Sequence, residues 1–106
     1  MPAWVQVPAG ATLAVGAMTA VSVGRNRLIL FRTADGYCAT DRRCTHQGAD
    51  LMRGYFDGRV IECPVHQGRF AVHDGCVLGA PASRPLRTYP VRVVGGEVYV
   101  EVDEPG

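Results

Sequence analysis

Two short segments of the chain each bring a cysteine and a histidine close together. Residues 44–48 read Cys-Thr-His-Gln-Gly, and residues 63–68 read Cys-Pro-Val-His-Gln-Gly. Thiolate and imidazole are the side chains that most often bind transition metals in proteins. Their short spacing, repeated in two places, predicts that one metal centre is held by two loops. The four candidate ligands are Cys44, His46, Cys63 and His66.

Turn signals recur along the chain and predict an all-β fold. Asp-Gly or Gly-Gly pairs lie at 35–36, 57–58, 74–75 and 95–96, and Gly-Arg-Asn at 24–26. These pairs supply the positive φ angles of tight hairpin turns. Short β-branched and aromatic runs lie between them at 21–23, 28–31, 37–40, 60–62, 91–94 and 97–102. The last run alternates, with Val98, Val100 and Val102 on one face, as in a half-exposed antiparallel strand. We therefore expect an antiparallel β-sandwich or small barrel.

The predicted strands place both candidate metal-binding segments at hairpin tips. Cys44 follows the strand that ends near Asp41, and Cys63 follows the strand that begins after the turn at 57–58. Two such tips can approach each other at one end of a sandwich. The stretch 79–85, stiffened by two prolines, is expected to lie against them.

Composition restricts the function classes. The chain has 106 residues, enough for one domain, and its net charge of +1 gives no basis for binding nucleic acid. Residues 1–24 are uncharged, but they lack the basic start of a secretory signal. No stretch approaches the roughly 20 apolar residues of a membrane span. We expect a cytoplasmic protein without membrane contact, in which cysteines bind metal more readily than they form disulfides.

Two kinds of metal centre fit two cysteines and two histidines. A structural zinc site uses this ligand set, and Cys-Pro-x-His is similar to a zinc knuckle. The Cys-x-His spacing of the first segment suits a zinc ribbon less well. The repeated His-Gln-Gly ending favours two loops that make matching backbone bonds to bridging sulfides. An iron–sulfur cluster is therefore the favoured interpretation, and zinc is the alternative.

Beyond the ligands, the chain resembles the small Rieske-type ferredoxins over about residues 4–102. Residues 41–51 resemble the first loop of that family and residues 61–70 the second. The downstream pattern is similar at 74–75, 79–86 and 89–91. The resemblance implies an antiparallel Rieske fold. A cluster-binding subdomain of about 40–80, with two ligand-bearing hairpin loops, is inserted in a base subdomain of about 1–39 and 81–106.

The resemblance also implies the role of each ligand of one Rieske-type [2Fe–2S] cluster. Cys44 and Cys63 would hold the inner iron, and His46 and His66 would hold the outer iron near the surface. The outer iron would receive the electron, because imidazoles donate less charge than thiolates. No coordination position stays open for a substrate, so we expect an electron carrier without catalytic residues.

Four positions predict a low reduction potential. High-potential members of the family resemble Cys-Thr-His-Leu-Gly-Cys and Cys-Pro-Cys-His-Gly-Ser, in which the two extra cysteines form a disulfide. Ala49 and Val65 replace those cysteines, Gly68 replaces the serine, and Phe70 replaces a nearby tyrosine. Hydrogen bonds to cluster sulfur raise the potential, and the chain lacks both hydroxyl donors. We expect a potential near the low end of the Rieske range.

The functional prediction is the ferredoxin component of a bacterial aromatic-ring-hydroxylating dioxygenase system. As a monomer, it would carry single electrons from an NAD(P)H-dependent flavoprotein reductase to a terminal Rieske non-haem iron oxygenase, with partners docking over His46 and His66. Charged residues expected around that tip are Arg42, Arg43, Arg53, Arg69, Arg84, Asp50 and Glu62. The alternatives are the small subunit of an assimilatory nitrite reductase and a zinc-stabilised interaction module.

Several other residues carry structural expectations. Trp4 is expected to anchor the core of the base subdomain, and Cys38 to pack as a small apolar residue. Cys76 is expected to be buried or a free thiol, without a disulfide to Cys38. His73 should be an exposed residue beside a turn. Pro81 is expected to shield the cluster from water.

Overall fold

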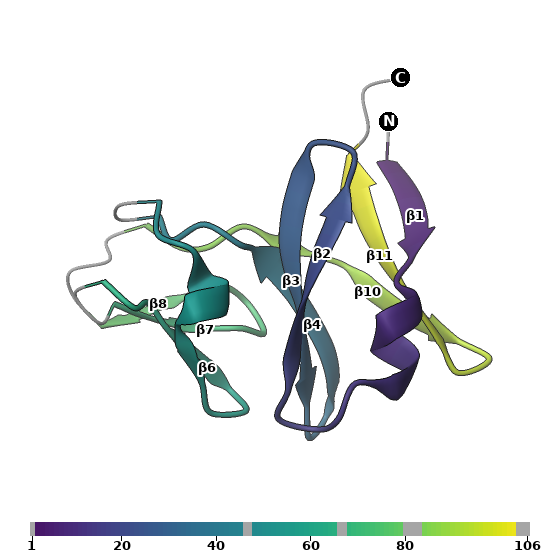
Figure 1. Cartoon of the computed structure of the whole chain (residues 1–106), viewed down its shortest axis with the longest axis horizontal. Helices are drawn as coiled ribbons and strands as arrows, with labels where there is room; N and C mark the ends of the chain where they lie inside the picture. Colours follow the sequence, from purple (N-terminus) through teal and green to yellow (C-terminus); the bar gives the residue numbers. More distant parts are fainter. Residues whose placement is uncertain (1, 46–47, 66–67, 80–83, 104–106) are drawn as a thin grey trace.

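A computed structural model of the chain describes residues 2–45, 48–65, 68–79 and 84–103, and all of its sheets are antiparallel (Figure 1). The first part of the chain forms β1 (Pro2–Gln6), the 3₁₀ helix η1 (Pro8–Thr12), β2 (Met18–Val23), β3 (Asn26–Thr33) and β4 (Gly36–Asp41). The middle forms η2 (Leu51–Arg53), β5 (Tyr55–Phe56), β6 (Val60–Glu62), β7 (Arg69–Ala71) and β8 (Val77–Gly79). The last strands are β9 (Thr88–Tyr89), β10 (Val91–Val94) and β11 (Glu97–Asp103).

The strands form three sheets, which confirms the predicted all-β fold class. Their orders are β1-β11-β10, β2-β3-β4-β9 and β5-β6-β7-β8. The third sheet is built entirely from the chain between β4 and β9. These two strands are themselves neighbours, with Ala39 opposite Tyr89 and Thr40 opposite Thr88. The chain therefore leaves the second sheet, builds the third, and returns beside the point it left (Figure 1).

Each predicted turn joins two paired strands. The pairs at 35–36 and 95–96 connect β3 to β4 and β10 to β11, while those at 57–58 and 74–75 connect β5 to β6 and β7 to β8. The turn at 57–58 shows why aspartate stands first. The Asp57 carboxylate accepts hydrogen bonds from the amides of Arg59 at 2.9 Å and Val60 at 2.8 Å. These bonds also lower the pKa of Asp57.

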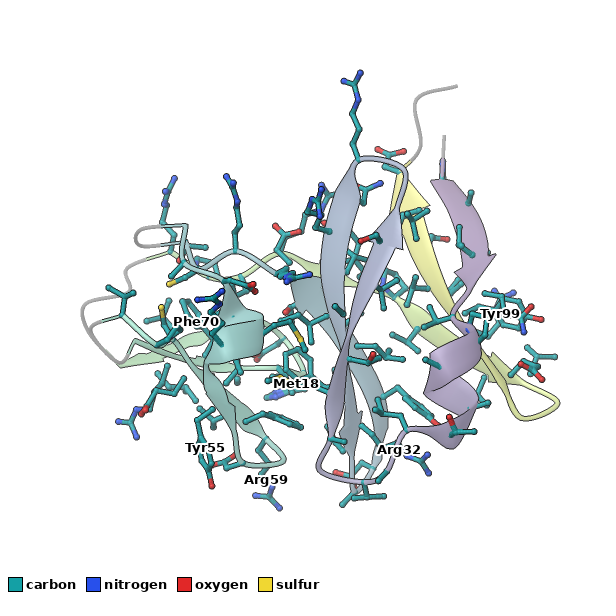
Figure 2. The ribbon with its side chains drawn as sticks, viewed as in Figure 1. Met18, Arg32, Tyr55, Arg59, Phe70 and Tyr99 are labelled. Atoms are coloured by element: carbon teal, nitrogen blue, oxygen red, sulfur yellow. The ribbon has the colours of Figure 1, made fainter. Side chains whose placement is uncertain are left out.

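Strand β3 is buried on both faces and joins two hydrophobic cores. Leu28 and Leu30 face the core formed with β11, where Val98, Val100 and Val102 are buried as the alternation predicted. Ile29 and Phe31 face the second core, which contains both cysteines of the candidate site. The Phe31 ring lies 4.7 Å from that of Phe56, centroid to centroid. Met18 packs against this second core, between β2 and the third sheet (Figure 2).

Gly75 joins the third sheet to the returning chain through a close backbone contact. Its φ angle is +77°, a conformation that favours glycine. Its amide donates a hydrogen bond to the carbonyl of Ala71, the last residue of β7. A Cβ atom at this position would lie 2.1 Å from the carbonyl oxygen of Leu86. The Leu86 amide in turn donates to the Gly75 carbonyl at 2.9 Å. The turn at 74–75 therefore positions the chain that leads back to β9.

The structure corrects one expectation and adds strands that the sequence did not indicate. Trp4 is not a core anchor: it is half-buried on β1, and the guanidinium of Arg92 lies 4.2 Å from its ring centroid. The sequence also did not indicate β1, β5, β7, β8 or β9, most of which are too short to show an alternating pattern. Among the described residues, no helix has the length and apolarity needed to cross a membrane.

Candidate metal centre

The first candidate loop is the tip of a hairpin that closes immediately before Cys44. Arg43 and Asp50 form an antiparallel bridge across its base. The Cys44 amide donates to the carbonyl of Ala49 at 2.8 Å, and its carbonyl accepts the amide of Gly48 at 2.9 Å. Gly48 has a φ angle of +68°, so the glycine at this position allows the chain to turn back.

The second candidate loop has a similar closure. It joins β6 to β7, in which Glu62 lies opposite Arg69. The Cys63 amide donates to the carbonyl of Gly68 at 2.7 Å. In both loops the cysteine amide thus bonds to the carbonyl five residues further along the chain. The two cysteines occupy equivalent places in two hairpins, as the repeated motif predicted.

The structure brings the two cysteine side chains together in the protein interior. Cys44 is 3% exposed and Cys63 is 1% exposed, and both are free thiols. Burial raises the pKa of the Cys63 thiol, and the hydrogen-bonded Cys44 thiol raises it further, while the Val65 amide acts in the opposite direction. Two facing thiols that are costly to ionise alone are suited to a shared cation, which stabilises both thiolates. This donor pair fits an iron that needs two sulfur ligands.

The other predicted ligands, His46 and His66, lie outside the described residues, as does Pro81. Their ligand and shielding roles remain predictions from the sequence. The nearest described residues are Thr45 and Gly48 on either side of the first histidine, and Val65 and Gly68 on either side of the second.

An ion pair fixes the base of the first loop. The Arg42 guanidinium makes two parallel hydrogen bonds to the Asp50 carboxylate, each 2.8 Å long. The same carboxylate accepts the amide of Met52 at 3.0 Å, which caps η2. The Arg42 hydrogen bond is the main reason that the pKa of Asp50 falls to about 2. Asp50 therefore stays ionised at neutral pH and ties the loop to η2.

A second connection, which the sequence did not indicate, ties the first loop to the returning chain. The Thr45 hydroxyl donates to the carbonyl of Arg84 at 2.7 Å. The Arg84 guanidinium donates to the carbonyl of Thr45 at 3.2 Å. The two residues are 39 positions apart, so the sequence pattern gave no signal for this contact. It does agree with the expectation that this part of the chain lies beside the candidate loops.

The surroundings of the two thiols are apolar. Leu51, Ile61, Phe70 and Leu86 are buried in the same core as both cysteines. Phe70, one of the positions used to predict a low potential, is fully buried (Figure 2). Val65 is 37% exposed at the second loop. The two thiols thus lie among buried apolar side chains, and the apolar side chain of Val65 is exposed at the surface.

The remaining cysteines and the third histidine lie apart from this pair. Cys38 is half-buried against the second core, as expected, and burial raises the pKa of its thiol. Cys76 is an exposed free thiol that donates to the Asp74 carboxylate at 3.2 Å. His73 is exposed beside the turn, as expected, and its Nε2 lies 3.2 Å from Asp74.

Comparisons with known proteins agree with this geometry. The model of the Rieske [2Fe–2S] domain family matches residues 3–90. The ferredoxin component of the naphthalene 1,2-dioxygenase system of Pseudomonas putida is 37% identical over 99 residues, 93% of this chain and 95% of that protein. A chain in the solved complex of reduced oxygenase and oxidised ferredoxin of carbazole 1,9a-dioxygenase is 41% identical, with a TM-score of 0.85. The match covers 92% of this chain and 91% of that one.

The chain belongs to the Rieske [2Fe–2S] domain family. It is an electron-transfer ferredoxin with one Rieske-type [2Fe–2S] cluster and is not itself an enzyme. The cluster, and not zinc, is therefore the metal centre. A protein named as the small subunit of an NADH-dependent nitrite reductase from Mycobacterium tuberculosis shares the fold, with a TM-score of 0.81 and coverage of 99% of both chains. Its identity is only 26%, so the ferredoxin assignment is better supported than this alternative.

Proposed function

We propose that this ferredoxin carries single electrons from an NAD(P)H-dependent flavoprotein reductase to the terminal oxygenase of an aromatic-ring dioxygenase system. The observation that carries this proposal is the pair of buried, facing thiols at two equivalent hairpin tips. They lie in a chain that is similar along nearly its whole length to a ferredoxin component of a dioxygenase system. The ferredoxin–oxygenase complex of a relative supports the oxygenase as the electron acceptor.

We propose Cys44, His46, Cys63 and His66 as the four cluster ligands. The two cysteines would bind the inner iron, because both thiols lie in the apolar interior. The two histidines would bind the outer iron, because they follow the cysteines in the two loops, and in the second loop the intervening Pro64 and Val65 are exposed. When bound, the cluster supplies one reversible electron. Buried apolar side chains surround the two thiols. The first loop is fixed by the bonds at Asp50 and Thr45, and the second by the bond of the Cys63 amide to the Gly68 carbonyl.

We also propose that the domain is divided as the family resemblance implies. The base subdomain comprises about 1–39 and 81–106, and the cluster-binding subdomain about 40–80. The topology supports this division, because the sheet β5-β6-β7-β8 is formed by the part of the chain between β4 and β9, which pair with each other in another sheet. The electron transfer partner would bind over the loop tips, where Pro64 and Val65 are exposed. We place the protein in the cytoplasm as a monomer, where NAD(P)H-dependent reductases can supply electrons.

We propose a reduction potential near the low end of the Rieske range, about −150 mV. Gly68 and Phe70 stand where high-potential members have hydroxyl donors and carry no hydroxyl, and the Phe70 ring is fully buried. The Thr45 hydroxyl already donates to the carbonyl of Arg84. Spectroelectrochemical titration should give a clearly negative midpoint, and a positive midpoint would contradict the proposal.

Reconstitution tests the proposed pathway directly. The purified protein should be red-brown, and its reduced form should give the electron paramagnetic resonance signal of a Rieske cluster. Combined with NADH or NADPH, a flavoprotein reductase and a terminal oxygenase from the same genome, it should support hydroxylation of an aromatic substrate. Omission of the ferredoxin should abolish product formation. Turnover that is equally fast without it, or a colourless zinc-containing protein, would refute the proposal.

A further inference from the structure

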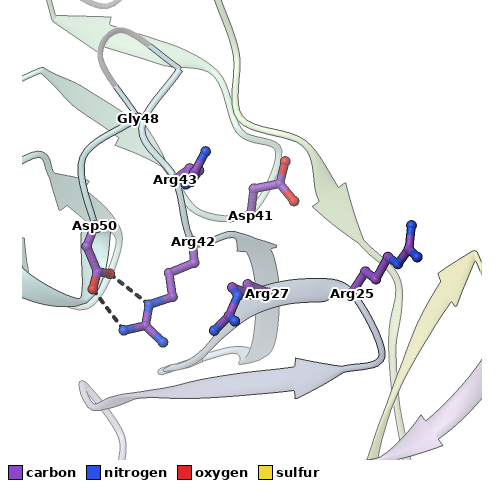
Figure 3. Close-up of a pocket in the computed structure, with 7 residues that line it drawn as sticks. All are labelled: Arg25, Arg27, Asp41, Arg42, Arg43, Gly48 and Asp50. Atoms are coloured by element: carbon purple, nitrogen blue, oxygen red, sulfur yellow. Dashed lines mark hydrogen bonds and ion pairs between the residues drawn. The ribbon is translucent and has the colours of Figure 1, made fainter.

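An open groove of about 560 Å³ lies beside the first cluster loop (Figure 3). Its lining residues are Arg25, Arg27, Asp41, Arg42, Arg43, Gly48 and Asp50. They come from two places in the sequence, the β2–β3 hairpin and the segment on either side of Cys44. A hydrogen bond of 3.1 Å from the Arg42 amide to the Arg27 carbonyl holds these two segments together. The groove therefore extends from the base strands to the edge of the cluster site.

The two aspartates in this groove have hydrogen-bond partners, whereas three of its four arginines do not within the described residues. Asp50 is paired with Arg42, and Asp41 accepts a hydrogen bond of 2.5 Å from the Tyr89 hydroxyl. The side chains of Arg25, Arg27 and Arg43 are exposed, and within the described part of the chain they form no hydrogen bond or ion pair. Four arginines face two aspartates, so positive charge is in excess. Three guanidinium groups remain available for a partner.

We propose that this groove binds carboxylates on the surface of the terminal oxygenase that accepts electrons from the ferredoxin. Guanidinium groups bind carboxylates through two parallel hydrogen bonds, which fix orientation as well as attract. The groove is open and spread over two hairpins, which suits a protein surface better than a small ion. Because Arg43 and Gly48 lie on either side of Cys44, a partner bound there would lie next to the first cluster loop. This inference rests on the proposed function, because it names a docking surface for that electron transfer.

Two double variants test the groove against net charge alone. Arg25→Glu/Arg27→Glu reverses the charge of the two arginines on the β2–β3 hairpin, which lie outside the cluster loops. Arg59→Glu/Arg92→Glu makes the same change of charge elsewhere. Arg59 lies near the β5–β6 turn, at the opposite end of the molecule from the β2–β3 turn (Figures 1 and 2). Arg92 lies on β10 over Trp4. Far-UV circular dichroism and the visible spectrum check that both variants fold and hold the cluster.

The first measurement is stopped-flow reduction of the terminal oxygenase that is active in the reconstituted system. At low ionic strength the groove variant should lower the second-order rate constant about tenfold, because surface charge acts mainly on association. The rate constant of the groove variant should also depend less on salt concentration than that of the wild type. The control variant should change the rate constant less than about twofold. Arg25→Lys/Arg27→Lys should retain much of the rate, since the charge is kept. An equal loss in both double variants would overturn the proposal.

The second measurement does not depend on an oxygenase. Fluorescence anisotropy should show a fluorescein-labelled hexaglutamate peptide binding to the wild type and the control variant but not to the groove variant. Equal binding to all three proteins, or none to the wild type, would overturn the groove. Inorganic phosphate should compete no better than sodium chloride at equal ionic strength, and strong competition would instead indicate a small-anion site. If the peptide binds as expected while the wild type reduces no oxygenase, the proposed pathway fails but the carboxylate-binding groove remains.

Discussion

Cys44 and Cys63 show how one residue pair connects sequence, packing and function. Each follows the last ladder pair of a hairpin, so its amide completes the loop while its side chain turns into the core. The sulfur atoms meet in an apolar environment, and the residues after them carry the chain toward the surface. Each short motif therefore has a gradient of exposure, from a buried cysteine to exposed residues further along the loop. That gradient suits a centre that exchanges electrons with another protein.

Replacement of a proposed histidine ligand should remove the cluster spectrum. We expect His66→Ala to lose the Rieske visible and electron paramagnetic resonance signals, because the outer iron would lack one of its two imidazoles. His73→Ala is the matched control, since that side chain is 74% exposed and lies beside a turn. It should retain both signals. An unchanged spectrum for His66→Ala would contradict the ligand assignment.

The ion pair of Arg42 with Asp50 should stabilise the protein in a defined pH range. The pKa of Asp50 in the folded chain is about 2, below the value of about 3.9 expected when unfolded. Its contribution is therefore complete above about pH 4 and is lost as the pH falls toward about 2. Urea unfolding followed by circular dichroism should show Asp50→Asn less stable than the wild type at pH 6. The difference should disappear near pH 2, and a constant difference would contradict this account.

At the scale of elements, the turns and short strands place the two loops. The Asp-Gly pairs at 57–58 and 74–75 each end one strand and begin the next, and they fold the third sheet around Phe70. The contact of Gly75 with Leu86 then orients the chain that returns to β9. The turns therefore help to position the cluster loops, together with core packing.

A methyl group at Gly75 should destabilise the protein more than one at another positive-φ glycine. Gly75→Ala combines an unfavourable backbone conformation with a Cβ only 2.1 Å from the Leu86 oxygen. Gly95→Ala is the control, because Gly95 has a φ angle of +57° and open space around it. The control should lose about 1–2 kcal/mol, and Gly75→Ala should lose clearly more. Thermal unfolding by circular dichroism measures both, and equal losses would show that the close contact can relax.

The sequence predicted those elements whose patterns are local. Strands β6 and β10 have the predicted bounds, and β3 and β4 extend one or two residues beyond their predicted runs at each end. The cysteine positions followed from the repeated motif. The sequence could not place Arg25 and Arg27 near the cluster loop, since a bond between distant backbone groups brings them there. Trp4 was predicted to anchor the core, whereas β1 is an edge strand with a half-exposed face.

At the scale of the whole molecule, β3 makes the two cores depend on each other. Leu30 is fully buried against the β11 side, and its neighbour Phe31 is fully buried against the cluster side. A disturbance of one face must shift the strand that supports the other. Base and cluster site should therefore lose their structure together.

A cavity made far from the cysteines should consequently affect cluster retention. Leu30→Ala should cost about 2–5 kcal/mol of stability. During heating, the loss of visible absorbance and the loss of far-UV ellipticity should both shift to lower temperature by similar amounts. The exposed substitution Val15→Ala serves as the control and should shift neither, since Val15 is 61% exposed. A shift in ellipticity alone would show that the two cores unfold independently.

The adjacency of β4 and β9 has a consequence for how such domains diversify. The chain leaves and re-enters the second sheet through two neighbouring strands, paired at only two positions. The segment between them forms a complete sheet, β5-β6-β7-β8, whose core is completed by Ile29 and Phe31 of β3. Lengthening, shortening or exchanging that segment does not require the surrounding strands to be rethreaded. One scaffold can therefore carry redox centres of different potential, or present them to different partners, while its own strand order stays the same.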